Sequence, residues 1–136
     1  MSDFNDRIIA EFRANGGVVA RFGSNLVLLH SIGAKTGEER VSPVMSIDRP
    51  DGSWLIAASA AGAARHPGWY YNLVAHPDAT VETGDDTVDV VATAVEDPDY
   101  DAAWAQFTSR SPGFADYQVR AGSRRIPVIR LAPIRE

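Results

Sequence analysis

A glycine-bounded turn at residues 33–37 carries the first side chains that could bind a ligand. Its sequence is Gly-Ala-Lys-Thr-Gly, and Arg40 follows three positions later. Lys35 and Arg40 could converge on a phosphate, with Thr36 as a neutral donor, because hydrogen bonds between a cation and a phosphate are short and strong. The spacing does not match a Walker loop, and an ordinary exposed hairpin turn is the alternative.

A second segment combines small residues with the start of a helix. Residues 57–64 have almost no side-chain bulk, and Pro67 then opens a helix predicted over 67–75. Helix N-termini carry unpaired N–H groups and a positive dipole end, so they favour anions and carbonyl groups. Bare backbone beside flat aromatic side chains suits a phosphorylated, planar organic cofactor, although small residues can also simply permit tight packing. The predicted ring-binding wall consists of Ala58, Ser59, Ala60, Ala61, Gly62, Pro67, Trp69, Tyr70 and Asn72.

A third segment, residues 114–125, contains two aromatic residues and three arginines ahead of the final strand. We interpret it either as a loop that covers one end of the fold or as a lid over a planar substrate. In the second interpretation the Tyr117 hydroxyl donates a proton or a hydrogen bond to the substrate. Ser59 is the second candidate for the proton source.

Composition excludes several other kinds of chemistry. The chain has 136 residues, a net charge of −5 and no cysteine. An acidic chain is a poor candidate for binding nucleic acid, and the absence of cysteine excludes disulfides and thiolate sites. The three histidines, His30, His66 and His76, lack metal-ligand spacing, and no nucleophile elbow surrounds Ser59. We therefore expect no metal, no nucleic-acid partner and no membrane span, and a cytoplasmic location.

The elements that would position these residues follow from periodicity and turn signals. A helix is expected from Asp3, with Phe4, Ile8 and Phe12 on one face. We expect this face to pack on the body of the domain, and contact with a membrane is the alternative. A third helix, after the one predicted over 67–75, is expected to follow Asp97-Pro98, with Tyr100, Trp104 and Phe107 along one side. Strands are expected at 26–29, 40–47, 53–59, 80–83, 87–95 and 126–131, with a hairpin turn at 84–86 and a possible edge or bulge at Pro43.

Short turns rather than helices join most of these strands. That pattern favours an antiparallel barrel with helices packed around it, an α+β fold that is mainly β, over a doubly wound parallel sheet. We expect a single domain over residues 1–136. Residues 1–24 would form an N-terminal helix and lead-in, and residues 25–136 the barrel core.

Taken together and in order, these motifs resemble the deazaflavin-dependent nitroreductase family, whose members use coenzyme F420. The resemblance runs from about Leu26 to Pro133. The motifs that carry it are residues 33–40, Pro43-Val44, Ala58-Ser59 with Gly62, residues 66–73, His76-Pro77, Tyr117 and residues 124–128.

The resemblance implies a split β-barrel that binds reduced deazaflavin in a groove. Lys35 and Arg40 would hold the phosphate and acidic tail, with Thr36 and Pro43 in the same binding region. Backbone groups at Ser59–Gly62 and the helix at Trp69–Asn72 would hold the ring. Such proteins donate hydride to quinones, nitroaromatics or other planar acceptors, and a separate enzyme regenerates the reduced coenzyme.

Two other functions remain open on the residues alone. The same barrel could bind FMN, since Lys35 and Arg40 would serve either phosphate. It could also be a non-catalytic protein that stores or carries a cofactor or an apolar ligand. The sequence leaves the oligomeric state open.

Overall fold

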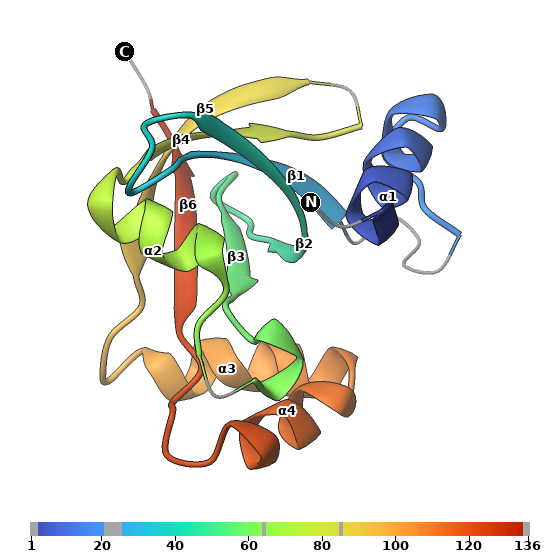
Figure 1. Cartoon of the computed structure of the whole chain (residues 1–136). Coiled ribbons are helices and arrows are strands. Elements are labelled where there is room, and N and C mark those ends of the chain that lie inside the picture. Colours follow the sequence, from blue (N-terminus) through green and yellow to red (C-terminus); the bar gives the residue numbers. More distant parts are fainter. Residues whose placement is uncertain (1–2, 21–25, 64, 85, 135–136) are drawn as a thin grey trace.

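The architecture, seen in a computed structural model that describes residues 3–20, 26–63, 65–84 and 86–134, is a closed antiparallel barrel with helices around it (Figure 1). The strands are β1 (Leu26–Ile32), β2 (Glu39–Asp48), β3 (Trp54–Ala57), β4 (Asp78–Glu82), β5 (Thr87–Ala94) and β6 (Val128–Pro133). They follow the order β1-β2-β3-β6-β5-β4, and β4 pairs back with β1 to close the barrel. The barrel predicted from the short turns is confirmed.

Some strands end at residues other than the predicted ones, because their pairing with the neighbouring strand continues further or stops earlier than expected. β1 extends to Ile32 because its pairing with β2 continues as far as Glu39. β3 ends at Ala57 rather than Ser59, since its ladder with β6 stops at Val128. The hairpin between β4 and β5 forms as predicted, with residue 85 of its turn lying outside the described residues.

The helices are α1 (Asp3–Ala14), α2 (Gly68–Ala75), α3 (Tyr100–Arg110) and α4 (Gly113–Ala121), together with a short 3-10 helix, η1 (Ala60–Gly62). Figure 1 shows α3 and α4 side by side beyond one end of the barrel, whereas α1 and α2 lie against its wall. Within the described residues, none of these helices has the length and apolar character needed to span a membrane.

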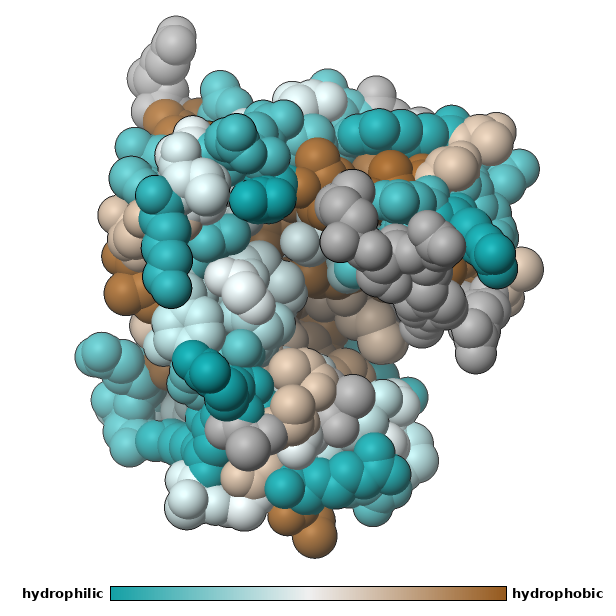
Figure 2. Space-filling view, in the orientation of Figure 1, coloured by the Kyte–Doolittle hydropathy of each residue, from teal (hydrophilic) through white to brown (hydrophobic). Residues whose placement is uncertain are grey.

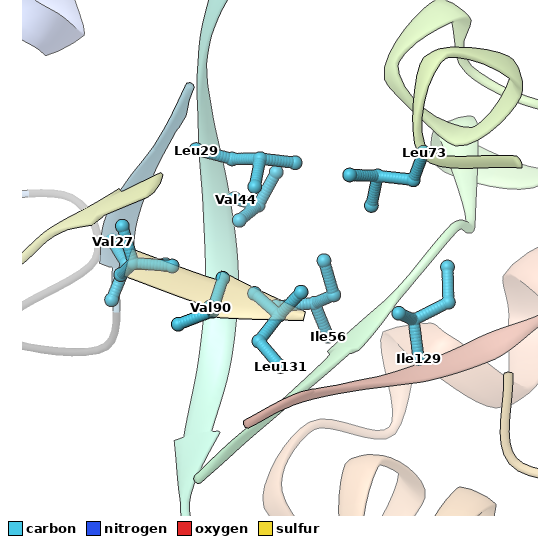
Figure 3. Packing of buried hydrophobic residues seen from close by; sticks show 9 residues of the cluster. Val27, Leu29, Val44, Ile56, Leu73, Val90, Ile129 and Leu131 are labelled. Carbon is cyan, nitrogen blue, oxygen red and sulfur yellow. The ribbon is translucent and has the colours of Figure 1, made fainter. Parts of the chain in front are cut away.

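The barrel core is built from alternating strand residues and one helical residue. Val27, Leu29, Ile56 and Leu131 are all buried, and Leu73 of α2 points into the same cluster (Figure 3). Burying a leucine side chain contributes roughly 1.5–3 kcal/mol. Leu73 therefore fixes α2 on the barrel. It also determines which face of α2 points away from the core.

The helix α1 is fastened to the barrel by packing and by backbone contact. Ile8 and Phe12 are buried in a cluster with residues of β1, which confirms the expected packing of this face on the domain. A Cβ atom added to Gly17 would lie 2.7 Å from Gly84 Cα, so the turn after α1 rests directly on the β4–β5 hairpin. The Phe4 side chain and lead-in residues 21–24 lie outside the described residues.

The predicted loop over residues 114–125 is wrong, because most of it is the helix α4. Phe114 and Ala121 are buried and Tyr117 is half-buried, a spacing that places all three on one face of a helix. The helix packs beside α3, where Phe114 contacts Phe107 with ring centroids 5.3 Å apart. Gly122, at φ 65°, ends it.

Candidate functional site

An open cleft of about 1060 Å³ lies between α1, the β1–β2 turn, the start of β2 and the beginning of α2. Pockets for drug-sized ligands span roughly 300–1,000 Å³, so this cleft has room for a large ligand. Figure 2 shows hydrophobic residues between hydrophilic ones on this face of the molecule. The lining residues are Asn5, Asp6, Ile9, Gly33, Ala34, Lys35, Thr36, Glu39, Arg40, Val41, Ser42, Arg65, Pro67, Gly68, Trp69, Tyr71 and Asn72.

The β1–β2 turn is held in shape by its own backbone. The Gly33 N–H donates to Glu38 O at 2.7 Å, and the Gly37 N–H donates to Gly33 O at 2.9 Å. Gly37 adopts φ 72°, a left-handed conformation that favours glycine. Thr36 Oγ1 accepts a hydrogen bond from the Glu38 N–H at 3.2 Å, and it retains its own proton for donation.

Three cations and two carboxylates line the cleft of this acidic protein. Lys35 and Arg40 come from the turn and β2, as predicted, and Arg65 joins them from the segment before α2. Arg40 Nη2 lies 3.9 Å from Glu38 Oε2, a weak exposed pair. Within the described part of the chain, Lys35 and Arg65 form no ion pair, so both charges are available to an anionic ligand.

Asn72 connects the turn to α2. Its Oδ1 accepts the Ala34 N–H at 2.9 Å, and its Nδ2 donates to Ser31 Oγ at 3.2 Å. The Ser31 side chain is fully buried in β1. Asn72 thus lines the cleft, and its side-chain amide ties α2 both to β1 and to the turn that carries Lys35.

The small-residue segment before α2 lies beside α4 and is bound by Arg124. Gly62 adopts φ 80°, and a Cβ atom added there would lie 2.7 Å from Tyr117 O. Gly62 therefore packs against the backbone of α4, and a side chain at this position would meet that helix first. Of Ala61, only the backbone is described.

Arg124 holds this segment by its carbonyl groups. Its guanidinium donates to Ala58 O at 3.0 Å, Ser59 O at 2.7 Å and Ala63 O at 2.9 Å. It also donates to His66 Nδ1 at 2.8 Å. Burial, and then the Arg124 charge, lower the pKa of His66, which is consistent with a neutral imidazole that accepts this bond.

The structure brings some predicted site residues to the cleft and places others beside it. Lys35, Thr36, Arg40, Pro67, Trp69 and Asn72 line it. The other predicted residues do not: Pro43, Ala58, Ser59, Ala60, Ala61, Gly62, Tyr70 and Tyr117.

Each of the outlying residues has a definite place. Ala58 is fully buried, with its N–H bonded to Pro127 O. Pro43 pairs with Leu28 of β1, in a part of β2 that has no pairing with β3. Such an edge position is expected for a proline, because proline has no backbone N–H to donate to a neighbouring strand. Tyr70 lies against His66, with ring centroids 4.4 Å apart.

Tyr117 packs edge-on against Phe114, with ring centroids 5.8 Å apart, and the Arg120 guanidinium lies 6.0 Å from the centre of its ring. Its hydroxyl forms no hydrogen bond to any described residue. The roles of Tyr117 and Ser59 in catalysis stay predictions.

Sequence reasoning missed several cleft residues. Tyr71 lines the cleft in place of Tyr70, because Tyr70 and Leu73 are three positions apart and face the core together. Arg65 is a basic residue just ahead of a helix start, a local signal that could have identified it. Asp6 and Ile9 belong to α1 and reach the cleft through tertiary packing, which leaves no local signal.

Comparisons with known proteins find relatives that match most of the chain. Residues 6–133 match the model of a family described as F420H(2)-dependent quinone reductase. The chain is 39% identical over 106 residues to F420H(2)-dependent quinone reductase Rv1261c from Mycobacterium tuberculosis, covering 76% of this chain and 70% of that protein.

Solved structures agree with the fold. A structure described as F420-H2 dependent reductase (FDR-A) is similar at a TM-score of 0.70 with 32% identity, covering 79% of this chain and 93% of that one. The haem storage protein HutZ from Vibrio cholerae is similar at a TM-score of 0.60 with 17% identity, covering 94% of this chain and 89% of that one. At that identity the second likeness shows the fold alone.

Proposed function

The chain belongs to the F420H(2)-dependent quinone reductase family, and from this premise we propose that it transfers hydride from reduced coenzyme F420 to a planar, electron-poor acceptor of the quinone type. The single observation that supports this most is the cleft between the β1–β2 turn and α2, which is lined both by three cations and by the aromatic rings of Trp69 and Tyr71. A separate F420-reducing enzyme would regenerate the cofactor. A cytoplasmic location remains a prediction, as does the division at residue 24.

The residues of the cleft fit the anionic part of this cofactor. Lys35 of the β1–β2 turn, Arg40 of β2 and Arg65 of the segment before α2 all line the cleft. A phosphate followed by an acidic tail carries several negative charges, and each of these can pair with a cation of this set. Asn72 and Thr36 keep the turn in shape while Lys35 binds.

The ring would lie against Trp69 and reach beyond the lining of the cleft to the backbone of the small-residue segment, which leads into Arg65 and Pro67. Trp69 and Tyr71 supply flat apolar surface beside Pro67 and Gly68 at the start of α2. Coenzyme F420 supplies a hydride donor when bound, and the chain supplies orientation and a shielded, partly apolar surface. We assign Tyr117 or Ser59 as the group that donates a hydrogen bond or proton to the acceptor as its negative charge develops.

Two alternatives are less well supported. FMN carries one phosphate and would leave part of the cation set unused. A non-catalytic haem carrier would share the fold of HutZ, but at 17% identity that likeness extends to the fold alone. Both alternatives are decided by the same titration.

The test is binding of F420, FMN and haem to the purified protein, followed by reduction of menadione. We expect F420 to bind most tightly. Lys35→Ala and Arg65→Ala should each weaken F420 binding by about tenfold, as loss of a charged hydrogen bond does, and flatten its dependence on salt. Arg110→Ala removes an exposed arginine of α3 and serves as the matched control.

Each result has a defined meaning. Wild-type affinity in both cleft variants would refute the binding mode, and tighter binding of FMN would replace the cofactor assignment. F420 binding without reduction of menadione would favour a carrier. Tyr117→Phe should slow single-turnover oxidation of the bound reduced cofactor by roughly a hundredfold if the hydroxyl protonates the acceptor, and equal rates would exclude that role.

A further inference from the structure

Arg124 makes an unusual set of contacts for a half-buried arginine. Nε, Nη1 and Nη2 each donate to a different carbonyl of the segment 58–63, at 2.7–3.0 Å. Three donors in a planar fork can hold three carbonyls in one fixed arrangement, which a lysine ammonium cannot reproduce. The proposed binding mode gives Arg124 no contact with the ligand.

Gln118 of α4 fixes the backbone that carries Arg124. Its Nε2 donates to Arg124 O at 2.8 Å, and its Oε1 accepts the Ile126 N–H at 3.0 Å. The guanidinium therefore extends from a braced segment to the small-residue loop. Through this connection α4 supports the loop from behind.

The contacts also fix where the N–H groups of the loop point. A trans peptide unit is planar, and its C=O and N–H bonds point in opposite directions. Because the carbonyls of Ala58 and Ser59 face Arg124, the N–H groups of Ser59 and Ala60 face away from it. Neither N–H has a hydrogen-bond partner among the described residues.

The backbone conformation of the loop agrees with this orientation. Ser59 is in the right-handed helical region, and Ala60 has φ 48°, a conformation that residues other than glycine rarely adopt. Alternating right- and left-handed residues bring successive N–H groups together into a concave donor site. The Arg124 contacts to the flanking carbonyls hold Ala60 in that conformation.

We propose that Arg124 is a positioning residue that aims the N–H groups of Ser59 and Ala60 at the carbonyl-bearing edge of the bound ring, an inference that rests on the proposed function. The side chain itself does not touch the cofactor. It acts through the peptide units that it holds, and its positive charge polarises their N–H bonds further.

The test compares Arg124→Lys with Arg125→Lys, a matched change at the next position. Arg125 lies elsewhere, paired with Asp97 at 2.8 Å and stacked on Tyr100. Amide NMR signals of ¹⁵N-labelled protein are followed during titration with F420. In the wild type we expect the signals of Ser59 and Ala60 to shift together with those of residues 33–37.

In Arg124→Lys we expect the F420 dissociation constant to rise about tenfold. The Ser59 and Ala60 signals should lose most of their response while residues 33–37 keep theirs. Arg125→Lys should behave as the wild type in both respects. In Arg124→Ala, millimolar methylguanidinium should restore affinity in part, which a general loss of stability would not allow.

The outcomes separate the inference from its premise. In the wild type, the signals of residues 33–37 could respond to F420 while those of Ser59 and Ala60 do not. That result would overturn the role of Arg124 but leave the proposed function intact, and it requires no variant to fold. Wild-type affinity and response in a folded Arg124→Lys protein would do the same. If no cleft amide responds to F420, the proposed function fails and the inference fails with it.

Discussion

Replacing Asn72 with alanine should loosen the β1–β2 turn from α2 and destabilise the protein. The change removes the acceptor of the Ala34 N–H and the donor to Ser31 Oγ. Ala34 is exposed, so water can replace the lost acceptor. Ser31 is fully buried, so its hydroxyl would lose the partner that Asn72 supplies.

The two losses differ in size. A typical hydrogen bond contributes roughly 0.5–1.5 kcal/mol, and leaving a buried polar group unpaired costs about 1–3 kcal/mol. The expected loss for Asn72→Ala is about 2 kcal/mol of unfolding free energy, most of it from Ser31. For a domain of this size, that corresponds to a fall in Tm of roughly 5–12 °C.

A thermodynamic cycle with Ser31→Ala tests the origin of this loss. Ser31→Ala removes the hydroxyl that would be left unpaired, so the double variant should be less destabilised than the sum of the two single variants by about 1 kcal/mol. Thermal unfolding and F420 titration of all four proteins provide the measurements. An unchanged Tm for Asn72→Ala with a much weaker affinity would refute this reasoning, because Asn72 would then act on the ligand directly.

Two further predictions concern stability. Gly62→Val should lower the unfolding free energy by about 2–4 kcal/mol, because residue 62 has a left-handed backbone conformation and its new side chain would meet the α4 backbone at Tyr117. A normal Tm for this variant would contradict that packing. The hydrogen bond from Arg13 chiefly lowers the pKa of Glu82 from its ordinary value of 4.5, so its contribution to stability is present above pH 4.5 and is lost as pH falls through the lowered value. The Tm advantage of wild type over Glu82→Gln should therefore shrink between pH 6 and pH 3, and a constant difference would show that the pair is not coupled to folding.

The elements that could be predicted were those whose signal is local. The alternation and turn residues of the strands, and the Pro67 start of α2, depend on neighbours in sequence, and the barrel and its helices followed from them. α4 was missed because its polar and aromatic residues were interpreted by composition. The spacing of Phe114, Tyr117 and Ala121 would have indicated a helix.

The parts of the site that could not be predicted depend on tertiary contacts. Asp6 reaches the cleft because the Gly17 turn rests on Gly84, a contact between segments about 70 residues apart. The contacts from Arg124 to the loop at Ala58 span 66 residues. Residue type indicated which side chains could bind an anion, but only the folded chain shows which of them meet.

The position of β6 constrains the order in which the protein can assemble during synthesis. It is translated after β3 and β5, yet it lies between them and completes both ladders. Until residues 128–133 leave the ribosome, β3 and β5 each present an open edge, and their neighbours cannot enclose Ile56 and Val90. Open edges recruit other strands, so we expect chains in which β6 is not yet paired to associate with other chains more readily than chains with a closed barrel.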